Sequence, residues 1–132
     1  MREEIQPTEV MVPTRPYVPV VATEDLVFVS GQVPVDGDGA LAAEDLDGQV
    51  RAVIRNVEVC LRAAGSGLGD VVRVGAYLTS RDSFARFNEL YAEGFGGAKP
   101  VRTTIVCGLM DDRFLVEMDA IAVRPRTGAG SA

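Results

Sequence analysis

Arg102 is the residue whose type and setting point most directly to chemistry. Its neighbours Thr103, Thr104 and Ile105 suit a half-buried β-strand, where a guanidinium needs a partner. The planar fork of arginine matches a carboxylate through two parallel hydrogen bonds, and that carboxylate belongs either to the protein or to a ligand. The alternative is an arginine whose stem packs on the strand while its head reaches water or an acidic neighbour.

Two carboxylates near the C-terminus are the next candidates. Glu117 and Asp119 lie two positions apart and therefore share one face of an alternating strand. If strand pairing brings this face to Arg102, one carboxylate would orient the guanidinium while the other handles a proton or a water. A solvated strand face is the alternative interpretation.

The residues that are missing narrow the chemistry further. The chain has 0 His, which nearly excludes Ser-His-Asp and Cys-His mechanisms and ordinary zinc sites. Lys99, the only lysine, lies in a Gly/Ala/Pro stretch and is a poor basis for a Schiff-base enzyme. Cys60 and Cys107 have apolar neighbours, which indicates packing. Any catalysis must come from Arg, Asp, Glu, Tyr, Asn, Ser, Thr and backbone groups.

Charge and length limit the class of protein. Thirteen Lys and Arg against 19 Asp and Glu give a net charge of −6, and no basic cluster offsets it, so nucleic acid is not the expected partner. No apolar run is long enough to span a membrane, and the first four residues are not those of a signal peptide, so we expect a cytoplasmic protein. A length of 132 residues suits one domain.

Hydrophobic spacing predicts the elements that must position these side chains. We expect an extended, proline-containing N-terminal segment, a strand that stops at Ser30–Gly31, and a turn at residues 36–39. The clearest helix covers residues 46–64, with Asp45 as N-cap and Gly65 after its end. The remaining elements are strands at residues 70–79, 101–107 and 114–123 and a helix at residues 81–95.

The second helix places an amide beside its apolar stripe. Phe84, Phe87, Tyr91 and Phe95 form the predicted inward stripe, and Asn88 lies one turn from two of them. Asn88 is therefore either a satisfied amide at the edge of the core or a hydrogen-bonding group for a ligand.

This element order predicts an α+β fold with one mixed sheet and both helices on a single face. The last two strands have apolar side chains on both faces. The sheet face that no helix covers must be buried by something else, and a second copy of the chain is the simplest cover.

Taken together, these segments resemble the RidA/YjgF family of small trimeric imine deaminases, which is also described as L-PSP endoribonuclease-like. Three motifs are specific in combination: Ser-Gly-Gln-x-Pro at residues 30–34, Pro-x-Arg-Thr at residues 100–103, and Val-Glu-x-x-Ala-Ile-Ala at residues 116–122. Further matching stretches lie at residues 16–18, 49–65, 71–79 and 84–91.

The resemblance implies a chorismate-mutase-like single domain at residues 16–125, an N-terminal arm at residues 1–15 and a flexible C-terminal tail at residues 126–132. It also implies a homotrimer with ligand clefts between subunits. Arg102 would bind the substrate carboxylate and the backbone of Thr104 would contact the substrate nitrogen. Asp119 stands where the deaminases usually have a glutamate that positions the attacking water. The remaining matches to cleft-lining residues are Tyr17, Ser30, Gly31, Asn88 and Tyr91.

The function that the resemblance implies is hydrolysis of reactive enamines and imines, of the 2-aminoacrylate type, to 2-keto acids and ammonia. No cofactor or metal is expected, because the imine carbon is already electrophilic. Asp119 is one methylene shorter than glutamate, and a displacement of about 1 Å costs on the order of a hundredfold in rate. The alternatives are a non-catalytic trimer that binds carboxylates and an enzyme for a larger imine or enamine. A second departure from the family, the turn at Met110–Asp112, has no assigned role.

Overall fold

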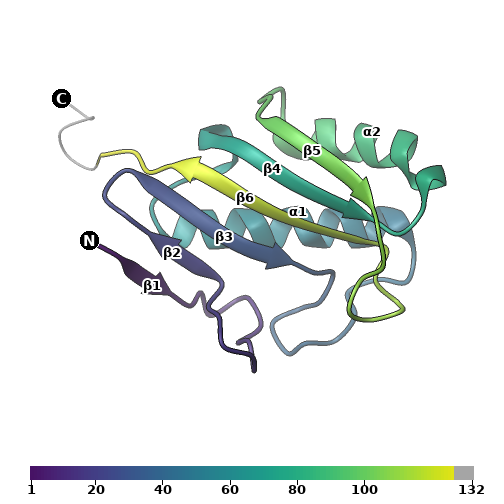
Figure 1. Ribbon diagram of the computed structural model, residues 1–132, viewed down its shortest axis with the longest axis horizontal. Helices are drawn as coiled ribbons and strands as arrows, with labels where there is room; N and C mark the ends of the chain where they lie inside the picture. Colours follow the sequence, from purple (N-terminus) through teal and green to yellow (C-terminus); the bar gives the residue numbers. More distant parts are fainter. Residues whose placement is uncertain (127–132) are drawn as a thin grey trace.

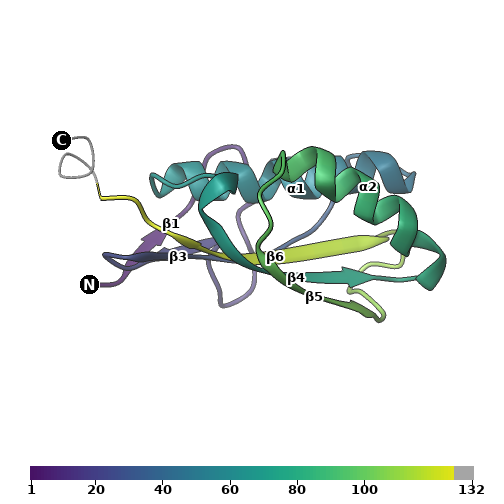
Figure 2. The ribbon, with the colours of Figure 1, turned by 90° about the horizontal axis from the view of Figure 1, so that it is seen from above.

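Six β-strands form one mixed sheet with the spatial order β1-β2-β3-β6-β4-β5. The computed structural model describes residues 1–126. Figures 1 and 2 show both α-helices on the same face of the sheet. The predicted α+β class, with one mixed sheet and two helices on one side, is therefore confirmed. The bounds are β1 Glu3–Ile5, β2 Val20–Ala22, β3 Leu26–Gln32, α1 Leu46–Ala63, β4 Val71–Leu78, α2 Phe84–Phe95, β5 Val101–Val106 and β6 Val116–Val123.

The strands pair antiparallel except at one edge of the sheet. β4 pairs with β5 in parallel and with β6 in antiparallel orientation. A parallel pair needs a crossover connection, and α2 supplies it. β5 is thus an edge strand that lies beside the helix preceding it in the sequence.

The predicted alternation of the last strand is confirmed. The core face of β6 consists of fully or nearly fully buried residues, namely Val116, Met118, Ala120 and Ala122. They contribute to one continuous core with the inward side of α1, including Val50, Val53 and Val57. Cys60 is part of this core, and burial raises the pKa of its thiol to about 12.

The first helix matches its prediction to within one residue at its end. Asp45 precedes α1 but makes no capping hydrogen bond with its side chain, whereas Gly65 has a φ of 80° after the helix. The second helix differs more. Residues 81–83 form a 3₁₀ turn, and Phe84 is 47% exposed although it was predicted to face inward. Leu90 is buried instead.

The N-terminal part is more ordered than predicted. The expected arm at residues 1–15 contains β1, which pairs with β2 at Val20–Ala22, and neither strand was predicted. β3 does not stop at Ser30–Gly31 but continues to Gln32, with an irregular register between Val29 and Gln32. The tail predicted at residues 126–132 lies, apart from Arg126, outside the described residues.

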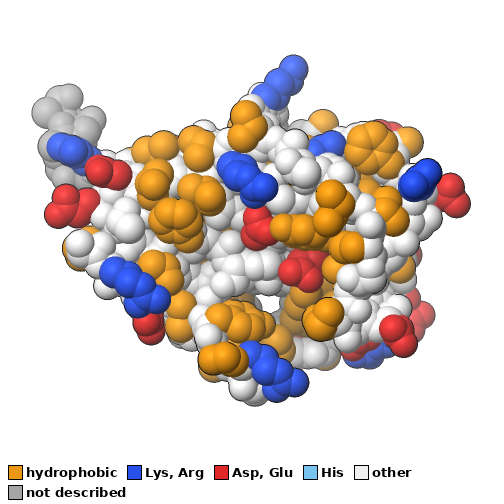
Figure 3. Space-filling view, in the orientation of Figure 1, with side chains coloured by type: hydrophobic (Ala, Val, Ile, Leu, Met, Phe, Trp, Pro, Cys, Tyr) orange, Lys and Arg blue, Asp and Glu red, His pale blue; other side chains and the backbone are white. Residues whose placement is uncertain are grey.

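The sheet face opposite the helices bears exposed apolar side chains. Phe28, Val72 and Val123 are exposed there, and Figure 3 shows hydrophobic side chains gathered over the strands. None of the helices within residues 1–126 is long and apolar enough to cross a membrane. The predicted uncovered face is therefore present in the single chain.

Candidate functional site

Arg102 lies in a cluster of aromatic and amide side chains at the sheet edge. Its Nη2 donates a hydrogen bond of 2.7 Å to Oδ1 of Asn88. The central carbon of its guanidinium lies 4.6 Å from the ring centre of Tyr91, 5.2 Å from that of Phe87 and 6.0 Å from that of Phe84. Rings at these distances attract a cation. These contacts hold the guanidinium in one place; we call this group the Arg102 cluster.

No carboxylate within residues 1–126 forms an ion pair with Arg102. The guanidinium of Arg102 has five N–H donors, and the hydrogen bond to the Asn88 oxygen uses only one of them. Most of these donors can therefore bind a ligand. A cavity of about 430 Å³ borders the cluster and is lined in part by Tyr91, Lys99 and Arg102. The hydroxyl of Tyr91 is buried and has no hydrogen-bond partner among residues 1–126. The arrangement suits a small anionic ligand with two acceptor oxygens.

Asp119 lies on the opposite face of the sheet from Arg102. Pairing places Arg102 beside Val74 of the core face, whereas Asp119 is beside Gly75 on the uncovered face. One carboxylate oxygen of Asp119 accepts a 2.6 Å hydrogen bond from the Tyr77 hydroxyl, and this bond is the main reason that the pKa of Tyr77 is raised to about 12. The structure does not bring Asp119 to Arg102.

Further contacts occupy the second oxygen of Asp119. It accepts a 3.2 Å hydrogen bond from the backbone N–H of Gly75 and lies 3.4 Å from Nη1 of Arg73. Both oxygens of Asp119 are thus engaged within the chain, which suits a role in fixing neighbouring side chains.

Glu117 of β6 borders a separate groove that residues at the end of β3 also line. Tyr17, Gly31 and Glu117 line this groove, which has a cavity of about 250 Å³; we call it the Glu117 groove. Burial raises the pKa of Glu117, and the nearby charge of Asp119 raises it further. A carboxylate with a raised pKa is better able to accept a proton near neutral pH.

The Glu117 carboxylate can lie against the backbone of residue 31 because Gly31 has no side chain. A Cβ atom at residue 31 would collide with Oε2 of Glu117. The side chain of Ser30 points elsewhere: its hydroxyl donates a 2.6 Å hydrogen bond to the carbonyl of Val18, next to Tyr17. Ser30 therefore holds the segment that presents Tyr17. Thr104 lies two residues after Arg102 and faces the same side of β5.

The expected site residues thus fall into two groups on different surfaces. Asn88, Tyr91, Arg102 and Thr104 belong to α2 and β5, and the others lie at or beside the Glu117 groove or on the uncovered face. Sequence reasoning missed Met110, which also lines the groove. Its signal was the unexplained turn at Met110–Asp112.

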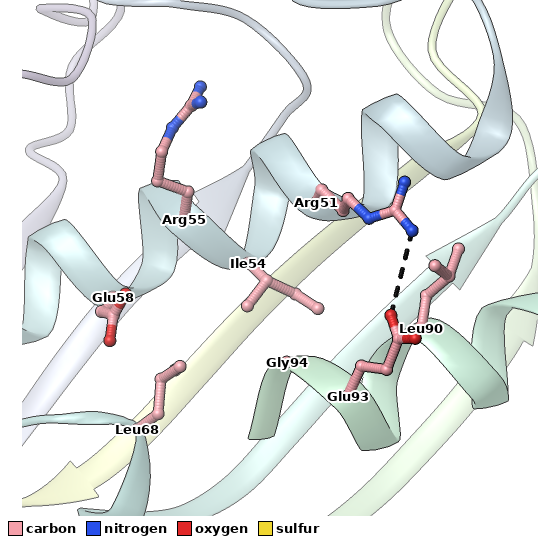
Figure 4. A pocket seen from close by; sticks show the side chains of 8 residues that line it. All are labelled: Arg51, Ile54, Arg55, Glu58, Leu68, Leu90, Glu93 and Gly94. Atoms are coloured by element: carbon pink, nitrogen blue, oxygen red, sulfur yellow. Dashed lines mark ion pairs between the residues drawn. The ribbon is translucent and has the colours of Figure 1, made fainter. Parts of the chain in front are cut away.

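A third hollow, of about 300 Å³, lies between α1 and α2 (Figure 4). Arg51 of α1 reaches toward Glu93 of α2, at 3.9 Å, while Arg55 points away from α2. None of the expected site residues lines this hollow. Its charges have both signs, so it offers no selective site for an anion.

Comparison with known families decides the relationship. Residues 8–124 match the family described as Endoribonuclease L-PSP, and the match includes every expected site residue. The chain belongs to this family. The L-PSP match covers the arm from residue 8 onward, strands β2 to β6 and both helices, and leaves out β1.

Relatives within the L-PSP family agree in sequence and structure. A RutC family protein of Pyrococcus abyssi is 37% identical over 113 residues, which are 85% of this chain and 89% of that protein. The YjgF gene product of E. coli has a TM-score of 0.86 at 28% identity, covering 93% of this chain and 99% of that chain. TdcF of E. coli, solved with bound serine, has a TM-score of 0.86 at 31% identity with the same coverage. The predicted RidA/YjgF resemblance is confirmed.

Proposed function

We propose that this protein hydrolyses 2-imino acids and their enamine tautomers to 2-keto acids and ammonia. The observation that supports this most directly is the state of Arg102, a half-buried guanidinium fixed by Asn88 and three aromatic rings with no ion-pair partner within residues 1–126. Such a group is prepared for the carboxylate of a small substrate.

The complete site is formed between two copies of the chain. Arg102 and Glu117 lie on opposite faces of one sheet, so one copy alone cannot present both to a small molecule. The exposed apolar face and the edge strand β5 need a cover, and a neighbouring copy would supply it. In a homotrimer, the Arg102 cluster of one subunit would face the Glu117 groove of the next.

The proposed reaction starts with the carboxylate of the 2-imino acid on Arg102. Glu117 accepts a proton from a water molecule, whose oxygen forms a bond to the imine carbon. Glu117 passes this proton to the imine nitrogen, and the hydroxyl group of the adduct gives up its own proton to the same nitrogen. The carbon–nitrogen bond then breaks, and ammonia leaves as the carbon–oxygen double bond forms. An enamine enters the same route after its β-carbon is protonated. Fixing water and imine next to each other supplies much of the rate.

This assignment gives Glu117 the role that the family resemblance gave to Asp119. Glu117 lines the groove and burial raises its pKa, whereas both oxygens of Asp119 already accept hydrogen bonds. The shorter side chain at residue 119 then does not limit turnover. The serine bound to TdcF is a small ligand with a carboxylate and an amino group, which agrees with this class of substrate.

The test couples an amino-acid oxidase, which generates 2-imino acids, to the purified protein in the presence of semicarbazide. Semicarbazide captures the imine that has not been hydrolysed, so an active protein lowers the yield of the semicarbazone. An unchanged yield, together with calorimetric binding of a keto acid, would favour the non-catalytic carboxylate-binding alternative over the enzyme.

A further inference from the structure

The Glu117 groove has an apolar wall that the proposed chemistry does not use. Carboxylate binding and water activation need only Arg102, Glu117 and nearby polar groups. The groove is lined in addition by Met11, Pro13, Pro19, Val33, Val35, Met110 and Phe114. Methionine side chains adapt to the shape of an apolar ligand. This apolar wall can therefore pack against an apolar side chain of the substrate.

Met110 stands out within this wall. It is 95% exposed, so its thioether makes almost no packing contact inside the chain although it borders the groove. A long apolar side chain held in water gains free energy when a ligand covers it. Met110 is thus available to close over an apolar group in the groove.

The turn that presents Met110 is fixed by its neighbours. Oδ1 of Asp111 accepts hydrogen bonds from the backbone N–H and from Nε of Arg113, at 2.9 and 3.0 Å, and Oδ2 accepts from Nη2 at 2.8 Å. The fully buried Gln49 donates to the carbonyl of Arg113 and accepts from the N–H of Leu115. These hydrogen bonds fix the backbone that follows Met110. The turn therefore does not have to become ordered when a ligand binds in the groove.

Charge restricts the ligand further. Among the described residues that line the groove there is no lysine or arginine, and Glu117 is their one charged side chain. An acidic side chain on the substrate would meet Glu117 without a compensating cation from the lining of the groove itself, and Arg102 of the neighbouring subunit would already be occupied by the substrate carboxylate. The groove accordingly disfavours acidic substrates.

We propose that Met110 is a specificity-determining residue and that the preferred substrates are 2-imino acids with an uncharged apolar side chain longer than methyl. This inference rests on the proposed function, because it assumes that the substrate's side chain enters the Glu117 groove. The extended apolar wall and the exposed, prepositioned Met110 support it.

The test compares imines generated by an amino-acid oxidase from leucine, alanine and glutamate. The wild-type protein should show a kcat/KM about tenfold higher for the leucine-derived imine than for the alanine-derived one, and the lowest value for the glutamate-derived one. Met110→Ala should lower the value for the leucine-derived imine by about tenfold and that for the alanine-derived imine by less than about twofold. Val12→Ala removes an exposed side chain of the N-terminal arm, between the groove residues Met11 and Pro13 but not itself part of the lining, and should change neither value.

Affinity for the products separates this inference from the proposed function. Calorimetry with 4-methyl-2-oxopentanoate and pyruvate should give tighter binding of the former, and Met110→Ala should remove the difference. If no imine is hydrolysed but this pattern of affinities holds, the proposed function fails and the specificity of the groove stands. Equal kcat/KM and equal affinity for long and short side chains, or an effect of Met110→Ala no larger than that of Val12→Ala, would overturn the inference.

Discussion

The guanidinium of Arg102 is fixed on three sides before any ligand arrives. Asn88 orients it through one hydrogen bond, and the rings of Phe87 and Tyr91 limit its movement. Its remaining N–H groups can bind both oxygens of a carboxylate at once. A lysine at this position would offer a point charge without the planar geometry that these neighbours orient.

Arg102→Lys should therefore weaken keto-acid binding by about 2–5 kcal/mol although the positive charge is retained. Arg55→Lys is the matched control, because Arg55 lies on the outer side of α1 and forms no ion pair within residues 1–126. Calorimetry on both variants checks the prediction. Wild-type affinity in Arg102→Lys would mean that the carboxylate binds elsewhere.

The roles of Glu117 and Asp119 can be distinguished by replacing each carboxylate with the corresponding amide. Glu117→Gln should slow hydrolysis by about 10²–10⁴-fold, since an amide accepts no proton from water. Asp119→Asn should retain most of the rate and instead weaken the contacts with Tyr77 and Arg73, which a lower Tm would report. The opposite pattern of rates would return the water-activating role to Asp119.

The pH dependence of the rate provides an independent check on Glu117. Burial raises its pKa, and only the ionised form accepts a proton. The rate should therefore fall as the pH decreases through the pKa of Glu117, which lies above the ordinary glutamate pKa. At higher pH the rate should be constant. Glu117→Gln should remove this dependence from the residual rate. A wild-type rate that stays constant down to the ordinary glutamate pKa would contradict the assignment.

At the level of elements, periodicity predicted α1 and β6 well, because each buries one face along its whole length. β1 and β2 were missed because three residues are too few to show a period. Alternation along β5 and β6 showed which residues share a face. It could not show that Arg102 and Asp119 lie on opposite faces of one sheet, because that depends on the register of both strands with β4.

β3 contributes the close contact between Gly31 and Glu117, and this contact can be tested directly. Gly31→Ala should leave the fold intact, because Gly31 has no positive φ, but the new methyl group must displace the Glu117 carboxylate. A displaced catalytic group costs about a hundredfold in rate. Gly69→Ala is the control, since a Cβ there meets nothing within 4 Å. Imine hydrolysis and circular dichroism on both variants provide the measurement, and an active Gly31→Ala variant would argue against the position assigned to Glu117.

At the scale of the whole molecule, the exposed apolar residues lie where a second copy would cover them. Val101, Ile105 and Val106 are exposed on the edge strand β5, and Phe28, Val72 and Val123 are exposed on the sheet face without helices. We expect a homotrimer with a mass of about three times 14.0 kDa by light scattering. A mass near 14.0 kDa at micromolar concentration would contradict it.

A site shared between copies makes a sharper prediction than mass alone. If each site takes Arg102 from one subunit and Glu117 from the next, inactive Arg102→Ala and inactive Glu117→Gln chains should complement each other when co-expressed. Random mixing in equal amounts leaves about one site in four with both native residues, so about a quarter of the wild-type rate should return. Co-expression of Arg102→Ala with a chain that has both substitutions should restore nothing, because no subunit then supplies the arginine. If the co-expressed single variants show no more than the sum of their residual rates, each site must take Arg102 and Glu117 from the same copy. The positions of the two residues on opposite faces of the sheet argue against that arrangement.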